Sequence, residues 1–132
     1  MAGRSPVRQR HVHRGRHITG EYSFKSRFED GPGANPEQLI AGAHAACFSM
    51  ALAAGLGDAG TPAQSVKTDA TVTLRFIDGA PTITAIALRT AGTVPGVDEA
   101  GFQAAAQQAK EGCPVSRALA GVPEITLEAS LA

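Results

Sequence analysis

The stretch Asn35-Pro-Glu-Gln-Leu-Ile-Ala-Gly-Ala-His-Ala-Ala-Cys-Phe-Ser-Met50 decides the fold of this 132-residue chain. Asn35 is a favoured N-cap residue, and Pro36 takes the first helical position, where its missing N–H costs nothing. Apolar residues then continue on nearly every side of the helical projection. The pattern predicts one long helix from Pro36 to about Leu56.

This apolar run approaches the length of a membrane-spanning helix, which is about 20 residues. His44 and Ser49 interrupt it, however, and most of its members are the weakly apolar Ala and Gly. No second span and no flanking cationic anchor accompany it. We therefore expect the central helix of a soluble protein, and no membrane partner.

Outward from this helix, the sequence alternates between strand and helix patterns. Strands with a period of two are expected at Tyr22–Phe28, Val66–Ile77, Thr82–Thr90 and Ile125–Leu131, and helices at Glu99–Glu111 and from Pro114 to near Gly121. The second and third strands are close enough to form an antiparallel hairpin. Hairpins combined with a few helices predict an α+β fold with an antiparallel sheet wrapped around the buried central helix.

So small a sheet cannot cover a helix that is apolar on every side. Some apolar surface would stay exposed to water unless a second copy of the chain covered it. The small residues at positions 41–46 would let a second helix approach closely. We therefore expect a homodimer.

Charge divides the chain into two parts. Residues 1–16 hold five arginines and no acid, whereas residues 17–132 hold 7 basic and 12 acidic residues. We interpret residues 1–17 as a basic, mobile tail and residues 18–132 as a single acidic domain, on which a surface for nucleic acid is not expected. The alternative is that the tail itself tethers the protein to nucleic acid or to an anionic membrane.

Two cysteines, Cys47 and Cys113, lie 66 positions apart, and neither belongs to a zinc-ligand motif. A signal peptide is not apparent, because no apolar segment follows the basic N-terminus. We therefore expect a cytoplasmic protein without a metal or other cofactor. In a reducing compartment, a pair of thiols indicates redox or nucleophilic chemistry more often than a structural disulfide.

The local sequence around each cysteine predicts which of the two thiols is the more acidic. Cys47 lies inside the apolar helix, where burial raises the pKa of a thiol. Cys113 precedes Pro114 at a predicted N-cap, where unpaired backbone N–H groups favour the thiolate. By this argument Cys113 is the more acidic cysteine and Cys47 its buried partner. One turn before Cys47, His44 is interpreted as a core histidine rather than a base.

Three stretches carry a resemblance to a known family: Tyr22-Ser-Phe-Lys-Ser-Arg-Phe-Glu29, Asn35–Met50 and Ala109-Lys-Glu-Gly-Cys-Pro-Val-Ser116. Together they resemble the OsmC/Ohr family. The Ser-Arg-Phe-Glu sequence and His44 resemble its OsmC branch, named after osmotically inducible protein C. The similarity extends from about Ile18 to the C-terminus.

The resemblance implies a thiol-dependent peroxidase that reduces organic hydroperoxides and works as an intertwined homodimer with two sites at the interface. It implies that Cys47 is the peroxidatic residue and Cys113 the resolving one, which reverses the ranking from local environment. Arg27 would supply the cation that Cys47 needs, and Glu37 would hold Arg27 by a bidentate contact. A small dithiol or protein thiol would restore the enzyme. Leu39, Phe48, Met50 and Phe28 would suit an alkyl chain.

Without the resemblance, both charged residues have structural explanations. Arg27 lies on the polar side of a predicted strand, and Glu37 in the first turn of a helix is explained by capping and the helix dipole. The alternative function is therefore a non-catalytic homodimer that binds a small ligand between its helices, with structural cysteines.

Overall fold

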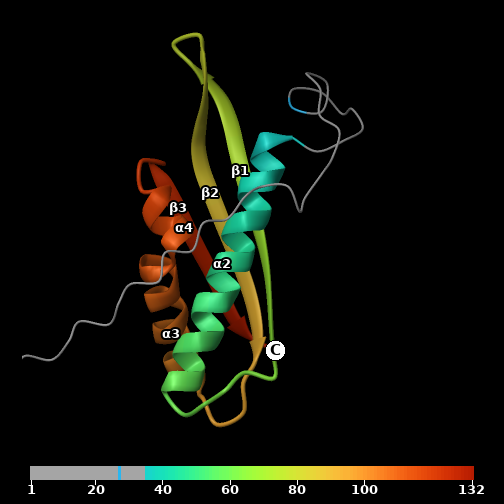
Figure 1. The fold of residues 1–132 in the computed structure, drawn as a ribbon, viewed down its shortest axis with the longest axis vertical. Helices are drawn as coiled ribbons and strands as arrows, with labels where there is room; N and C mark the ends of the chain where they lie inside the picture. Colours follow the sequence, from blue (N-terminus) through green and yellow to red (C-terminus); the bar gives the residue numbers. More distant parts are fainter. Residues whose placement is uncertain (1–26, 28–34) are drawn as a thin grey trace, which may run out of the picture.

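The protein, described here by a computed structural model at Arg27 and residues 35–132, is a two-layer α+β structure. In chain order the elements are α2 (Pro36–Asp58), β1 (Ser65–Ile77), β2 (Ala80–Thr93), α3 (Glu99–Gly112), α4 (Pro114–Ala118) and β3 (Glu124–Leu131). The strands form one sheet in the order β1-β2-β3, and the helices cover one of its faces (Figure 1). The predicted α+β fold is confirmed.

Helix α2 begins as the sequence predicts. The side chain of Asn35 accepts a hydrogen bond of 2.8 Å from the backbone N–H of Gln38, and the Gln38 side chain accepts one of 3.3 Å from the backbone N–H of Asn35. This reciprocal capping box satisfies two N–H groups that a helix start leaves unpaired. The helix continues to Asp58, slightly beyond the predicted end.

One side of α2 forms the core and the other side is open. Phe48, Leu52 and Leu56 are buried against α3 and the sheet, together with Phe102 and Leu88. On the other side runs an exposed stripe of apolar and small residues, with Leu39 55% and Met50 73% exposed. The exposed stripe consists of Leu39, Gly42, Ala43, Ala46, Met50 and Ala53. The expectation of a buried central helix therefore holds for one side of α2 only.

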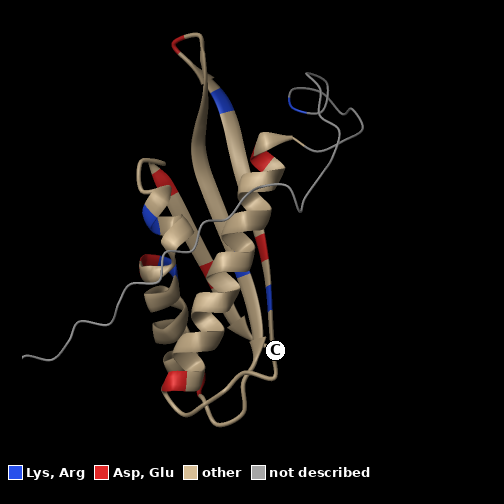
Figure 2. Ribbon diagram, in the orientation of Figure 1, with Lys and Arg blue, Asp and Glu red and all other residues tan. Residues whose placement is uncertain are grey.

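Charge is absent from α2 between Glu37 and Asp58, as Figure 2 shows. Among the described residues, α2 is the one helix that is long and apolar enough to cross a membrane by length and composition. Core helices of soluble proteins meet the same criterion, and α2 contributes the central core residues of this fold.

Strands β1 and β2 form the predicted antiparallel hairpin. Its turn has Asp78 at φ 50° and Gly79 at φ 80°, the pair of left-handed residues that fits the twist of a tight hairpin. Strand β3 pairs with β2 in parallel, with Ile125 opposite Ile86, so the sheet is mixed and the expectation of a purely antiparallel sheet is wrong for β3. The reason is that α3 and α4 together make a crossover long enough to return the chain to the starting end of the sheet.

Two predicted segments consist of residues that the structure does not describe. They are the tail at residues 1–17 and nearly all of the strand at Tyr22–Phe28. The exception is Arg27, whose backbone is helical, so the strand prediction is wrong at this residue.

A polar link joins α2 to the sheet close to Cys47. Ser49 donates a hydrogen bond of 2.6 Å to Thr68 of β1, and the hydroxyl of Thr68 lies 3.0 Å from that of Thr90 in β2. Thr90 in turn donates to the backbone oxygen of Lys67. The hydroxyl chain satisfies these side chains and fixes the rotation of α2 over the sheet at the level of Cys47.

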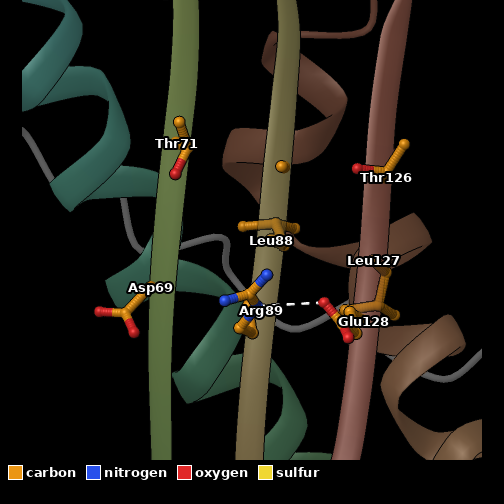
Figure 3. A pocket seen from close by; sticks show the side chains of 8 residues that line it. Asp69, Thr71, Leu88, Arg89, Thr126, Leu127 and Glu128 are labelled. Atoms are coloured by element: carbon orange, nitrogen blue, oxygen red, sulfur yellow. Dashed lines mark hydrogen bonds and ion pairs between the residues drawn. The ribbon is translucent and has the colours of Figure 1, made fainter.

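The outer face of the sheet is polar and faces away from the helices. A pocket on this face is lined by Asp69, Thr71, Arg89 and Glu128, among others, whose side chains Figure 3 shows. The ion pair between Arg89 and Glu128 measures 3.0 Å, but both side chains are more than 70% exposed, so solvent screens it. This face lies on the side of the sheet opposite to α2, which carries Cys47.

Candidate active site

The fold brings the two cysteines together. Cys47 lies in the middle of α2, and Cys113 caps the short helix α4, which packs against α2. Both are free thiols, and a hydrogen bond joins their side chains. The fold therefore makes interacting neighbours of two thiols that lie 66 positions apart in the sequence.

Cys113 is the N-cap that the sequence predicts. Its sulfur accepts a hydrogen bond of 3.4 Å from the backbone N–H of Ser116 and one of 3.5 Å from the Ser116 hydroxyl. Burial by itself raises the pKa of Cys113, but the hydrogen bonds from Ser116, Cys47 and the Val115 backbone together outweigh burial. The pKa of Cys113 is consequently lowered, which favours its thiolate.

Cys47 has the opposite tendency. Its pKa is raised, first by burial, then by the hydrogen bond that it makes to Cys113 and by the negative charge of that neighbour. The backbone N–H of Val115 acts in the opposite direction and lowers it. The ranking made from local sequence, with Cys113 as the more acidic thiol, agrees with this geometry. Because the two sulfurs interact directly, their protons leave as those of a coupled pair.

Access distinguishes the two sulfurs as well. Cys113 is fully buried, with 0% of its surface exposed, whereas Cys47 is only partly buried. A small molecule that arrives from solvent therefore reaches Cys47 first. The accessible sulfur and the acidic sulfur are different residues, and they are in contact.

Arg27 and Glu37 form the expected ion pair, with a different geometry. Arg27 Nη2 lies 2.9 Å and Nε 3.0 Å from the same oxygen, Glu37 Oε1. The expected bidentate contact to both oxygens is therefore wrong, because both nitrogens share Oε1. Glu37 is 8% exposed, and its buried Oε2 has no hydrogen-bond partner.

This ion pair lies far from Cys47 within one chain. Glu37 precedes Cys47 by ten residues on the same straight helix, which corresponds to a rise of about 15 Å. The groups that set the pKa of Cys47 are burial, Cys113 and the Val115 backbone. A single chain thus brings Cys47 to Cys113, and Arg27 to Glu37, but leaves the two pairs apart.

His44 and Ser116 also belong to this site. His44 is fully buried, its Nε2 lies 2.7 Å from the Ser116 hydroxyl oxygen, and burial lowers its pKa. Ser116 was not among the site residues predicted from the sequence. The available signal was its position three residues after the N-cap, where a polar side chain reaches back to the cap as in a capping box.

Metal-ligating side chains do not gather in the part of the chain that is described. No group of three or more His, Cys, Asp or Glu residues there could hold a metal ion.

The coupled thiols lead to a prediction about their titration. Cys113→Ser removes the negative neighbour that raises the pKa of Cys47, so the remaining thiol should ionise at a lower pH than it does beside Cys113. Cys47→Ala removes a hydrogen bond to Cys113 and should raise the pKa of Cys113. Ultraviolet absorbance of the thiolate against pH measures both. Wild type should lose its first proton below, and its second above, the ordinary pH range of cysteine; two thiols that ionise together at the ordinary value would contradict the coupling.

Comparison with known proteins identifies the family. The model of the family described as OsmC-like protein matches residues 29–128, most of the chain. The peroxiredoxin OsmC of Escherichia coli (strain K12) is 50% identical over 110 residues, which are 83% of this chain and 76% of that protein. An organic hydroperoxide resistance protein of Xanthomonas axonopodis pv. citri is 38% identical over 99 residues, 74% of this chain and 67% of that one.

Solved structures of OsmC and Ohr proteins share the fold of this chain. An organic hydroperoxide resistance protein OsmC from Legionella pneumophila superposes with a TM-score of 0.64 at 26% identity, covering 78% of this chain and 72% of that one. The organic hydroperoxide resistance protein OhrB of Bacillus subtilis gives 0.64 at 28% identity, with 77% and 73% covered. With the family model, a half-identical relative and the shared fold in agreement, this chain belongs to the OsmC-like protein family.

Proposed function

We propose that the protein is a cysteine-based peroxidase that reduces organic hydroperoxides to alcohols. The observation that carries this proposal is the contact between a partly exposed thiol, Cys47, and a buried acidic thiol, Cys113. The relatives named peroxiredoxin OsmC and organic hydroperoxide resistance protein support a peroxide-related function. The roles of the individual residues are inferred from the geometry and from the family resemblance.

The first step is the transfer of a proton between the sulfurs. In the resting pair, the thiol of Cys47 donates to the sulfur of Cys113, which favours the thiolate. When the proton passes to Cys113, Cys47 becomes the thiolate at the sulfur that solvent reaches. Cys113 thus acts as the base for Cys47, and the ranking of their acidities does not conflict with a peroxidatic Cys47.

The second step consumes the hydroperoxide. The Cys47 thiolate attacks the distal peroxide oxygen, an S–O bond forms and the O–O bond breaks. The alkoxide takes up the proton that Cys113 holds and leaves as the alcohol. Cys47 is now a sulfenic acid, and Cys113 is again a thiolate.

The third step joins the two sulfurs. The Cys113 thiolate attacks the Cys47 sulfur, so that an S–S bond forms, the S–O bond breaks and hydroxide leaves to become water with a proton from solvent. A dithiol or protein thiol then reduces the disulfide by exchange and is itself oxidised. No metal or other cofactor enters these steps.

Only some of the apolar residues expected to contact an organic substrate are exposed. Leu39 and Met50 are exposed on α2 and available to an alkyl chain, whereas Phe48 is fully buried in the core and is not. Phe28 lies outside the described residues. An apolar rim made by the exposed stripe is therefore the part of the proposed substrate surface that this chain supplies.

Activity of single-cysteine variants tests the proposal. With tert-butyl hydroperoxide and a dithiol, Cys47→Ser should lose at least about a hundredfold in turnover, because the nucleophile is gone. Without the dithiol, Cys113→Ser should consume one equivalent of hydroperoxide and then stop with Cys47 as sulfenic acid. Wild type should turn over hydrogen peroxide more slowly than tert-butyl hydroperoxide.

Ala100→Ser serves as the control, because it adds a hydroxyl to the exposed first turn of α3 and leaves both sulfurs in place. It should retain wild-type activity. Undiminished turnover by Cys47→Ser would refute the assigned nucleophile. Absence of any peroxide consumption by wild type would favour the non-catalytic alternative.

Arg27 completes the proposed site from a second copy of the chain. Its guanidinium is held on Glu37, about 15 Å along α2 from Cys47 in the same chain. The exposed stripe is an apolar surface onto which the α2 of a second copy would pack. In the homodimer that we propose, the partner subunit's Arg27 lies near Cys47 and stabilises its thiolate.

Mixed dimers test this arrangement. Arg27→Met and Cys47→Ser chains should each be slow as homodimers, but heterodimers of the two should regain activity, because one of their two sites combines an intact Arg27 with an intact Cys47. Arg89→Met, which removes an exposed arginine on the outer sheet face, is the control and should be fully active. Heterodimers that form, as seen by native mass, yet remain inactive would place Arg27 and Cys47 of one site in the same chain.

A further inference from the structure

A buried hydrogen-bond chain leads from α2 to the sulfur of Cys113. His44 Nε2 lies 2.7 Å from the Ser116 hydroxyl oxygen, and that hydroxyl donates to Cys113 at 3.5 Å. His44 and Cys113 are 0% exposed and Ser116 is 7% exposed. The chain crosses between two helices, because His44 lies one turn before Cys47 on α2, and Ser116 lies on α4 three residues after Cys113.

The direction of the hydrogens in this chain follows from the contacts. The single hydroxyl hydrogen of Ser116 points to the Cys113 sulfur, so the hydroxyl oxygen is left as an acceptor. With this orientation of the hydroxyl, we assign the hydrogen of the shorter contact to His44 Nε2, which donates it to Ser116. A neutral imidazole has only one N–H, and burial of His44 favours the neutral form. Both donors of the chain therefore point towards the sulfur.

Packing alone does not account for a histidine at this position. His44 Nδ1 is buried and has no hydrogen-bond partner, which costs the solvation of that nitrogen. Leu52 and Leu56 fill the same side of α2 without such a cost. The contact that offsets this cost is the one that His44 makes with Ser116.

We propose that His44 and Ser116 are positioning residues that hold the Ser116 hydroxyl against the Cys113 sulfur, and so favour the form of that sulfur that attacks Cys47 in disulfide formation. The role of these two residues in disulfide formation rests on the proposed peroxidase function, whereas their effect on the Cys113 thiolate does not. His44 transfers no proton in this scheme. It locks the orientation of the Ser116 hydroxyl, which otherwise could rotate away from the sulfur.

Other ionisable groups near Cys113 come from the two elements packed against α4, which are α2 and α3. Helix α2 contributes His44 and Cys47, and the end of α3 contributes Lys110 and Glu111. On α4 itself the charged residue is Arg117. Of these groups in the described part of the chain, Cys47 acts on the pKa of Cys113 directly, together with Ser116 and the Val115 backbone.

Titration of Cys113 as a single thiol tests the proposal. In a Cys47→Ser background, adding Ser116→Ala should raise the pKa of Cys113 by about one unit, so that about tenfold less thiolate is present near neutral pH. Adding His44→Leu should raise it in the same direction. His44→Gln offers an amide N–H in place of Nε2 and should restore the titration of the background. Ultraviolet thiolate absorbance against pH measures each variant.

The coupling between the two residues gives a sharper result. If His44 acts through Ser116, then His44→Leu should have no further effect once Ser116→Ala is present. An unchanged titration in Ser116→Ala would overturn the proposal, and a His44→Leu effect that persists without the hydroxyl would overturn the role given to His44. Should His44→Leu fail to fold, His44→Asn replaces it, because its shorter amide does not reach Ser116.

The titration uses no peroxide, so it separates this proposal from the proposed function. A shifted Cys113 in a protein that consumes no hydroperoxide would leave the positioning pair standing and remove the peroxidase. Full peroxidase activity together with an unchanged titration of Cys113 in Ser116→Ala would support the peroxidase and overturn the positioning role. In the active enzyme, Ser116→Ala should slow disulfide formation about tenfold.

Discussion

The hydrogen bond between the sulfurs of Cys47 and Cys113 is the contact on which the proposed chemistry of this protein depends. In this pair, Cys113 is the more acidic thiol and Cys47 is the thiol that solvent reaches. Cys113 is buried and accepts hydrogen bonds that favour its thiolate, whereas Cys47 is only partly buried and its pKa is raised. A pair of this kind can pass a proton between its members before the reaction and form a covalent bond after it.

The fold supplies this contact through two helix starts. The capping box at Asn35 begins α2 in the register that directs Phe48 and Leu52 into the core and leaves Cys47 at the edge of the packed side. The second start is α4, where Cys113 itself is the cap and Pro114 takes the first helical position. A cap must lie against the backbone N–H groups of its own helix, so the position of Cys113 and the acidity of its thiol have one cause.

The sequence predicted the local features well and the long-range ones partly. The cap at Asn35 and the hairpin of β1 and β2 depend on neighbours within a few residues, and both were confirmed. The acidity predicted for Cys113 also depends on near neighbours, and it agrees with the hydrogen bonds that its sulfur accepts from Ser116. The parallel pairing of β3 was not predicted, because strand periodicity carries no direction. Ser116 was missed because its partner His44 is 72 residues away. The ion pair of Arg27 with Glu37 came from family resemblance, and its distance from Cys47 follows only from the length of α2.

The central claim is that these two sulfurs react with each other once hydroperoxide has oxidised the accessible one. The most direct test is the intact mass of the reduced protein after treatment with one equivalent of tert-butyl hydroperoxide, followed by proteolysis without reductant. The oxidised protein should have lost two hydrogen atoms per chain and should yield a disulfide-linked peptide pair that contains Cys47 and Cys113 from the same chain. A stable gain of one oxygen at Cys47 with Cys113 still a free thiol, or no change in mass, would contradict it.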